Sequence, residues 1–285
     1  MSAAARSGPR RAWGPVWRSV LLHGALAVGA FLAMAPMIWM VSASLMPAGA
    51  ASTYPPRLFP GEVTFEHYRA LFTRLDLGRY FLNSTIIAVA VTAVSLVVNS
   101  MAGYAFAKLR FRGREPIFRA LSAGLVVPVQ VSMLPLFLLM KELGLINTYW
   151  GVIIPGMASI FGIFLIRQYA LAIPDDLLDA ARIDGAGELR TYWSVVLPNI
   201  VPILATLAIW TFLSTWNDFM WPLIVLSDES RYTLPVALAS LVGEHAQDTE
   251  LMMAGSVLTV LPVMLVFLFL QRYYVQGIMA GSVKG

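Results

Sequence analysis

Residues 175–202 read DDLLDAARIDGAGELRTYWSVVLPNIVP and form a polar island between two long apolar stretches. A connecting loop on a membrane surface needs no particular order of residues. This segment nevertheless contains signals for a helix, a glycine turn, a second amphipathic helix and a proline where the apolar sequence resumes. The ordered pattern predicts a docking element through which a second protein drives this one.

The first predicted helix of the island has a defined start and a defined end. Pro174 suits the first turn, where its missing N–H costs nothing, and the aspartates after it favour the positive end of the helix dipole. Gly185 suits the left-handed residue that ends a helix sharply. A second short helix is predicted from Glu188, and Pro198 marks the entry into the next apolar run.

An ordinary surface connector remains the alternative that composition leaves open. In that case the pair Asp179–Arg182 only solvates the helix, and such a pair contributes only about 0.2–0.5 kcal/mol.

Composition places most of the chain in lipid. Of the 285 residues 58% are hydrophobic and 13% are charged, and the mean hydropathy is +0.72. A soluble domain carries about 25% charged residues. Cysteine is absent, which excludes disulfides, thiol chemistry and cysteine-based zinc sites.

Six apolar runs are long enough to cross a bilayer, since a spanning helix needs about 20 mostly apolar residues. We therefore expect an all-α membrane protein with six transmembrane helices, at 19–45, 81–106, 118–139, 150–166, 200–226 and 251–270. Residues 1–18 then form a cytoplasmic N-terminal arm and residues 271–285 a cytoplasmic C-terminal tail. The membrane domain spans 19–270 and includes a cytoplasmic loop at 168–199.

The first run has a competing interpretation as a cleaved signal peptide. It follows several arginines and precedes the small residues Ala48-Gly49-Ala50. A signal core has about 7–15 apolar residues, and this run is longer, which favours a retained helix.

The lysines and arginines predict that the N-terminus lies in the cytoplasm, because such residues are enriched on that side. With this orientation fourteen of the 20 basic residues lie inside and six outside. The pI near 9.5 is thereby explained by topology, and no nucleic-acid partner is expected.

The apolar runs almost lack ionisable groups in their interiors. Their single acid, Asp218, is expected near the far end of the fifth run. Proton-driven carriers need mid-membrane acids or histidines, and the sequence has no phosphate loop and no HExxH or GxSxG pattern. We therefore expect a non-enzymatic chain that binds no cofactor or metal, so any uphill transport draws energy from another subunit.

The island closely resembles the EAA loop of permease subunits of binding-protein-dependent ABC importers. The matching residues are Asp179-Ala180-Ala181, Asp184-Gly185-Ala186, Leu197-Pro198 and Pro202. Asp179 stands where the family usually has glutamate, so the acid is kept but is one methylene shorter. Further stretches resemble the carbohydrate branch, in particular the shorter maltose-importer permease: TFEHYRALF at 64–72, WNDF at 216–219, WPL at 221–223 and AGSVKG at 280–285.

The resemblance implies the type I importer permease fold in a bacterial inner membrane, with both termini cytoplasmic. It implies a second permease subunit, two ATPase subunits that bind ATP and Mg, an external solute-binding protein and a sugar or sugar-like substrate. The loop would be a coupling helix that lies in a groove of the ATPase. Its coupling residues would be Asp179, Ala180, Ala181, Asp184, Gly185, Ala186, Leu197 and Pro198.

Several polar or aromatic positions in the apolar runs are candidates for the substrate path: Asn83, Asn99, Gln130, Trp210, Ser214 and Asn217. Hydrogen bonds between helices or anchoring at the membrane interface are the alternatives for these residues. An outer loop at 227–250 is expected to be exposed, and either is merely solvated or touches the binding protein. It carries Asp228, Glu229, Glu244, Asp248 and Glu250.

Two other function classes are alternatives to the importer. A secondary carrier predicts ionisable residues at mid-membrane, which the runs lack. A non-transporting scaffold subunit predicts no need for a shaped cytoplasmic loop.

Overall fold

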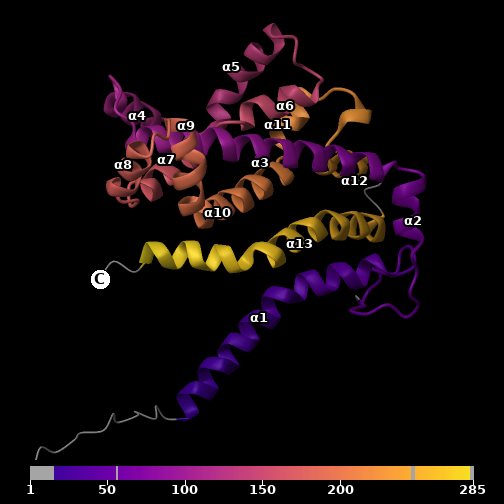
Figure 1. Cartoon of the computed structure of the whole chain (residues 1–285). Helices are drawn as coiled ribbons and strands as arrows, with labels where there is room; N and C mark the ends of the chain where they lie inside the picture. The colour runs from indigo at the N-terminus through magenta and orange to yellow at the C-terminus, as the bar shows by residue number, and fades with distance from the viewer. Residues whose placement is uncertain (1–15, 56, 245–247, 283–285) are drawn as a thin grey trace, which may run out of the picture.

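The computed structural model describes residues 16–55, 57–244 and 248–282, and all regular structure in these ranges is helical (Figure 1). The arginines at 6, 10 and 11 and Lys284 lie outside the described residues. Five helical stretches are long and apolar enough to cross a membrane, or six if one sharply bent pair is a single span. The chain is thus an all-α membrane protein with five to six candidate spans.

The five candidate spans differ in regularity. Two are continuous α-helices, α1 (Val16–Ser44) and α3 (Leu77–Lys108), and a third lies in α13 (Thr249–Ser282). A fourth consists of α6 (Tyr149–Gly156) and α7 (Ile160–Ala170). The fifth is a continuous run of α9 (Glu188–Thr191), the π-helical turn η2 (Tyr192–Val196) and α10 (Leu197–Trp216).

The remaining elements are shorter. They are α2 (Glu66–Thr73), α4 (Arg114–Ala123), η1 (Gly124–Val126), α5 (Val129–Glu142), α8 (Asp175–Ile183), α11 (Met220–Val225), η3 (Glu229–Arg231) and α12 (Leu234–Glu244).

Helix α3 is the central element of the bundle. It contributes buried residues to three of the four apolar clusters, which it shares with α7, α8 and α10, with α5, α6 and α11, and with α2, α12 and α13. Figure 1 shows α3 running through the upper layer, with α8 near one end and α2 at the other. The N-terminal half of α1 diverges from this bundle and exposes apolar side chains, which suit a lipid environment.

Polar side chains of α3 hold irregular segments of the chain in place. The Asn83 amide donates to the carbonyls of Ser230 (3.0 Å) and Tyr232 (2.9 Å) around η3. The Asn99 carbonyl oxygen accepts from the Ser159 amide (3.0 Å) at the break between α6 and α7. These bonds matter because an apolar environment has no water to replace a missing partner. An unpaired backbone group there costs roughly several kcal/mol.

The third apolar run, predicted as one span at 118–139, is a sharply bent pair of helices. Its two arms, from Arg114 to Val126 and from Val129 to Glu142, meet at an angle of 109°. Val127 and Pro128 at the break are both extended, as expected for the residue before a proline and for a helix that starts after one.

The fifth run also ends earlier than predicted. Helix α10 stops at Trp216 and the chain turns through Asn217 and Asp218 into α11, so the helix does not continue to residue 226. Asp218 accepts a hydrogen bond from the Trp221 amide (3.4 Å) near the start of α11, which favours a new helix there.

The second helix of the polar island is not separate from the fifth span. It continues through η2 into α10, and Pro198 lies inside the continuous helix and does not mark a re-entry. A proline lacks an N–H and crowds the carbonyl of the preceding turn, and the wider π-turn just before Pro198 accommodates that crowding.

The segment at 227–250 is not an exposed acidic loop. It contains η3 and α12, and Glu250 is 1% exposed at the start of α13. The carboxylate of Glu250 accepts from the Ala51 amide at 2.7 Å, which ties the segment after α1 to α13.

We predict that Gly103→Ala destabilises the bundle. A Cβ at this position would lie 2.6 Å from a methyl carbon of Ile166 and 3.0 Å from the Arg167 nitrogen, so α3 and α7 would have to separate. Overpacking of this kind costs about 1–3 kcal/mol. The melting temperature of the purified chain in detergent should fall, whereas Gly24→Ala, which meets nothing within 4 Å, should not lower it.

Candidate functional site

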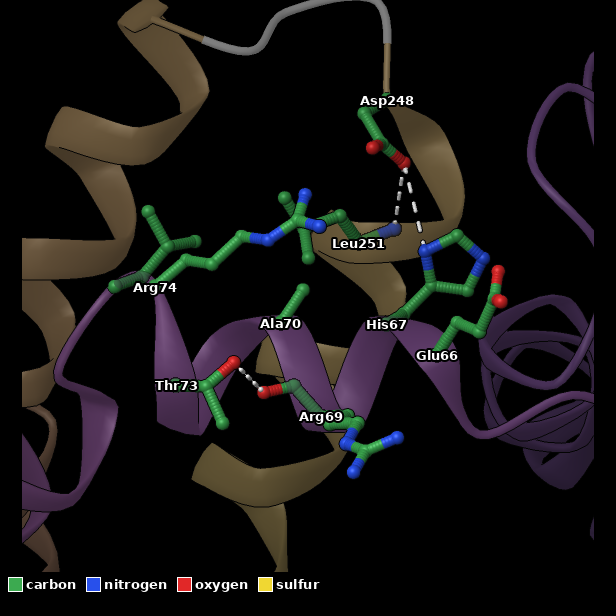
Figure 2. Close-up of a pocket in the computed structure, with 9 residues that line it drawn as sticks. Glu66, His67, Arg69, Ala70, Thr73, Arg74, Asp248 and Leu251 are labelled. Atoms are coloured by element: carbon green, nitrogen blue, oxygen red, sulfur yellow. Dashed lines mark hydrogen bonds and ion pairs between the residues drawn. The ribbon is translucent and has the colours of Figure 1, made fainter.

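A polar pocket of about 570 Å³ lies beside α2 and the start of α13 (Figure 2). The His67 ring nitrogen Nε2 donates to the Met46 carbonyl (2.9 Å), and Nδ1 lies 3.9 Å from Asp248. The lining also includes Glu66, Arg69 and Arg74. Among the described residues no group of three histidines or acids converges to hold a metal. The pocket therefore offers charges of both signs for polar contacts.

The helix α8 lies at the opposite end of α3 (Figure 1). Gly185 has φ +78°, a left-handed conformation that favours glycine. Its amide donates to the Arg182 carbonyl, and the Ala186 amide donates to the Ala181 carbonyl, both at 3.0 Å. This pair of bonds is the Schellman motif, and it ends α8 sharply.

One side of α8 packs on the bundle and the rest is open. Leu178 is 2% exposed and belongs to the cluster that includes Tyr104, Tyr192 and Ile200. It is the one fully buried residue of α8. The attachment of α8 to the bundle therefore depends largely on polar contacts.

The start of α8 is held by Lys108, the last residue of α3. Its ammonium donates to the Ile173 carbonyl (2.6 Å) and to an Asp175 carboxylate oxygen (2.7 Å). The lysine side chain is 7% exposed, so these bonds replace water for a nearly buried charge. The hydrogen bond and the charge of Lys108 hold the pKa of Asp175 below its usual range.

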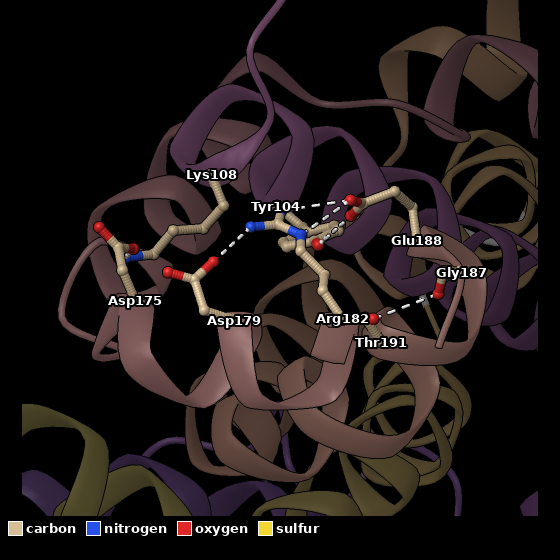
Figure 3. Close-up of polar contacts among 8 residues, drawn as sticks. All are labelled: Tyr104, Lys108, Asp175, Asp179, Arg182, Gly187, Glu188 and Thr191. Carbon is tan, nitrogen blue, oxygen red and sulfur yellow. Dashed lines mark hydrogen bonds and ion pairs between the residues drawn. The ribbon is translucent and has the colours of Figure 1, made fainter. Parts of the chain in front are cut away.

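The end of α8 is held by a chain of hydrogen bonds centred on Arg182 (Figure 3). Its guanidinium donates to Asp179 (2.9 Å) and to one oxygen of Glu188 (3.2 Å). The other oxygen of Glu188 accepts from the Tyr104 hydroxyl on α3 (2.8 Å). The hydrogen bond to Asp179, together with the charge of Glu188, raises the pKa of Arg182.

The predicted coupling residues fall into two groups. Asp179, Ala180, Ala181, Asp184, Gly185 and Ala186 lie on α8 or directly after it, and Leu197 and Pro198 begin α10. Ala180 and Asp184 are exposed, and Asp179 is exposed but paired with Arg182. Leu197 packs against the same apolar cluster as Leu178.

Exposed apolar side chains surround this end of the structure. Ile183 at the end of α8 is 86% exposed, and Leu189 and Trp193 in the following helix are 64% and 55% exposed. Large apolar groups exposed beside a polar helix are typical of a surface that another protein covers.

The substrate-path candidates lie in two kinds of environment. Asn83 and Asn99 are buried, and their amides hydrogen-bond within the chain. The other four are exposed: Gln130 on α5, Trp210 and Ser214 on α10, and Asn217 directly after it. The spacing of Trp210, Ser214 and Asn217 places them along one side of the helix.

Sequence reasoning missed the ties that hold α8. These ties are formed by Lys108, Tyr104 and Glu188, of which the sequence singles out only Glu188, as a predicted helix start. The bonds Lys108–Asp175 and Tyr104–Glu188 join residues 67 and 84 positions apart, so no local pattern reveals them.

Comparisons with known proteins agree on one family. The family model described as "Binding-protein-dependent transport system inner membrane component" matches residues 99–279. The arabinooligosaccharides transport system permease protein AraQ of Halalkalibacterium halodurans is 38% identical, over 94% of this chain and 98% of that protein. The lactose transport system permease protein LacG of Rhizobium radiobacter is 36% identical, over 93% of this chain and 96% of that one.

A solved structure shares the fold. It is a chain of a bacterial ABC transporter involved in the import of the acidic polysaccharide alginate, with a TM-score of 0.82 and 26% identity. The match covers 94% of this chain and 100% of the other.

We predict that Gly185→Val frays the end of α8. A left-handed residue with a Cβ costs roughly 1–2 kcal/mol, and the cost is greater for a β-branched side chain. Hydrogen exchange at the amides of 184–186 should become faster in the purified chain. Gly187→Val is the matched control, because Gly187 has φ −69° and open space around it. Equal exchange in both variants would contradict the prediction.

Proposed function

The chain belongs to the family of inner membrane components of binding-protein-dependent transport systems, and we propose that it forms part of the translocation path of an ATP-driven importer of sugars. A permease subunit of this family is a non-catalytic, multi-pass component of the inner membrane. The observation that carries the proposal is α8, a short capped helix that is exposed yet tied to the central helix α3.

For the topology, we propose six spans with both termini in the cytoplasm, the bent pair of α4 and α5 counting as one span. Residues 1–18 and 271–285 then flank a membrane domain at 19–270. The excess of basic residues on the cytoplasmic side supports this orientation.

For the coupling site, we propose that α8 lies in a groove of an ATPase subunit. The residues Asp179–Ala181 and Asp184–Ala186 would face or shape this contact, with Leu197 and Pro198 positioning the helix that follows. The exposed side chains of Ile183 and Leu189 support an apolar contact, and Asp179 offers a carboxylate to a basic group.

The substrate path is proposed to run along the face of α10 that carries Trp210, Ser214 and Asn217. Gln130 on α5 is proposed to belong to the same path. Hydroxyl and amide groups facing lipid are unfavourable, so this face suits a water-filled cavity shared with a second permease subunit. Asn83 and Asn99 would not contact the substrate, since their amides are already bonded within the chain. They would instead hold the segments that surround the path.

Sugars are supported as the substrate class by the names of the relatives, which transport arabinooligosaccharides and lactose. An aromatic ring beside hydroxyl and amide groups also suits a sugar, whose ring has an apolar face and a polar rim. Two ATPase subunits would bind ATP and Mg, and an external binding protein would deliver the sugar. The mixed-charge pocket beside α2 is proposed to face that protein.

The proposed mechanism is a population shift. ATP binding closes the ATPase pair, α8 moves with it, and the spans change from inward-open to outward-open. ATP must bind the complex better in the outward-open state than in the inward-open state, because a ligand without such a preference shifts nothing.

Co-purification and reconstitution test the function. The tagged chain, expressed with its neighbouring genes, should bring down a second permease and an ATPase with a phosphate-binding loop. Proteoliposomes holding this complex and the binding protein should take up radiolabelled arabinotriose or lactose only with ATP inside. Accumulation of solute against a gradient by the chain alone would instead support a secondary carrier.

We predict that Asp179→Lys reduces ATPase binding. The substitution places a second cation beside Arg182 and removes the acid offered to the groove. The amount of ATPase retained on the tagged chain should fall several-fold, while insertion of the chain is unchanged. Asp176→Lys is the control on the same helix, because Asp176 is exposed and forms no ion pair within the described residues.

We predict that Asn217→Leu weakens sugar passage without loss of ATPase binding. A hydrogen bond contributes about 0.5–1.5 kcal/mol, so the KM for uptake should rise roughly 2- to 10-fold. Asn199→Leu is the matched control, since both amides donate to the carbonyl four residues earlier, at 2.8 Å and 2.7 Å. Equal uptake kinetics for the two variants would show that Asn217 takes no part in sugar passage.

A further inference from the structure

We propose that α8 is clamped to α3 at both of its ends, and that Lys108, Tyr104 and Glu188 are positioning residues that make α3 move with α8. This inference rests on the proposed coupling role of α8. It adds the identity of the element that receives the motion and of the side chains that transmit it.

The first clamp lies where the chain enters α8. The ammonium of Lys108 donates to the carbonyl of Ile173 and to the carboxylate of Asp175, on both sides of Pro174. A nearly buried ammonium with two such short bonds is costly to detach, because its charge would lose both partners. The start of α8 therefore follows the end of α3.

The second clamp lies just beyond the end of α8. Glu188 uses one carboxylate oxygen for Arg182 of α8 and the other for the hydroxyl of Tyr104 on α3 (Figure 3). Glu188 is thus a bridge between the two helices. Charge-assisted hydrogen bonds of this kind are stronger than neutral ones.

The α3 end of this second clamp is fixed by packing. Tyr104 is 4% exposed, and its ring centroid lies 6.0 Å from that of Tyr192. The Tyr192 hydroxyl is in turn hydrogen-bonded to Ser100 of α3 at 2.6 Å. The segment after α8 is therefore attached to α3 at two successive turns, through residues 100 and 104.

The arrangement survives docking, because Arg182 has two acceptors. If Asp179 turns to a basic group on the ATPase, Arg182 keeps its bond to Glu188 and the clamp remains closed. Asp179 is the exchangeable partner and Glu188 the permanent one. The exposed position of Asp179 and the anchoring of Glu188 by Tyr104 fit this division.

Spin labels test the clamp directly, and this chain has no native cysteine, so it can be labelled at two introduced cysteines before the complex is assembled. The labels are placed at Asp176→Cys on α8 and Met101→Cys on α3, both exposed positions. The full complex with its ATPase subunits is measured without nucleotide and with ATP and Mg. A clamped pair should give the same narrow distance distribution in both states.

The clamp variants should loosen this pair. In Tyr104→Phe, Glu188→Gln and Lys108→Met we expect a broader distribution that changes with ATP, and ATP-driven uptake of the labelled sugar at least 5-fold lower per ATP hydrolysed. Lys108→Arg should restore both readouts. The double variant Tyr104→Phe with Glu188→Gln should be no worse than Glu188→Gln alone, because Glu188→Gln already weakens the bond that Tyr104→Phe removes.

Two controls separate the clamp from general damage. Tyr169→Phe removes a hydroxyl that has no hydrogen bond among the described residues, from a ring that packs on the same cluster. Arg190→Gln removes an exposed charge two positions from Glu188 that forms no ion pair in the described part of the chain. Both should behave like the unmodified chain.

The outcomes distinguish the clamp from the function on which it rests. If the clamp variants match these controls while Asp179→Lys loses the ATPase, the clamp is refuted and the importer function stands. If the unmodified chain neither retains an ATPase nor supports ATP-driven uptake, the proposed function fails first.

Discussion

Hydrogen bonding of irregular backbone within an apolar environment is the constraint on which this structure depends. Spans that break need partners for their free amides and carbonyls, since lipid supplies none. Helix α3 supplies them from Asn83 and Asn99, and the Ser84 hydroxyl accepts from the Leu234 amide at 2.7 Å. The breaks beside α6, η3 and α12 are thereby held to one continuous helix, which is why a bundle with so many interruptions has a defined centre.

The same helix has a similar role outside the apolar layer. There it fixes α8, as it fixes the broken spans within the layer. Lys108 bonds the segment entering α8, and Tyr104 reaches it through Glu188. The candidate coupling site is therefore an extension of the packing principle of the bundle. A helix with one buried residue, Leu178, keeps a fixed orientation because polar bonds at its ends replace the apolar contacts that it lacks.

Sequence reasoning succeeds here where the determining interactions are local. The glycine at 185, three residues after Arg182, predicts the end of α8, because the left-handed turn depends on the residue itself. Apolar length likewise predicts the spans at α1, α3 and α13. Sequence reasoning fails where apolar length predicts a continuous helix and a proline predicts a break. Pro128 does break its apolar run, whereas Pro198 lies within a continuous helix with a π-turn. The partners of Asn83 and Glu188 depend on the tertiary fold, so a single sequence contains no sign of them.

A coupling element has to satisfy two opposing requirements. It must expose enough surface to be grasped, which excludes deep burial, and it must not rotate or unfold when it is pushed. Apolar packing meets the second requirement only by sacrificing the first. Ion pairs at the two ends of a short helix meet both, because they fix its two ends and leave the side of α8 that faces away from the bundle exposed. The short side chain of Asp179 fits this design: its carboxylate stays close to Arg182 on its own helix, so this exposed acid is already paired in the unbound chain.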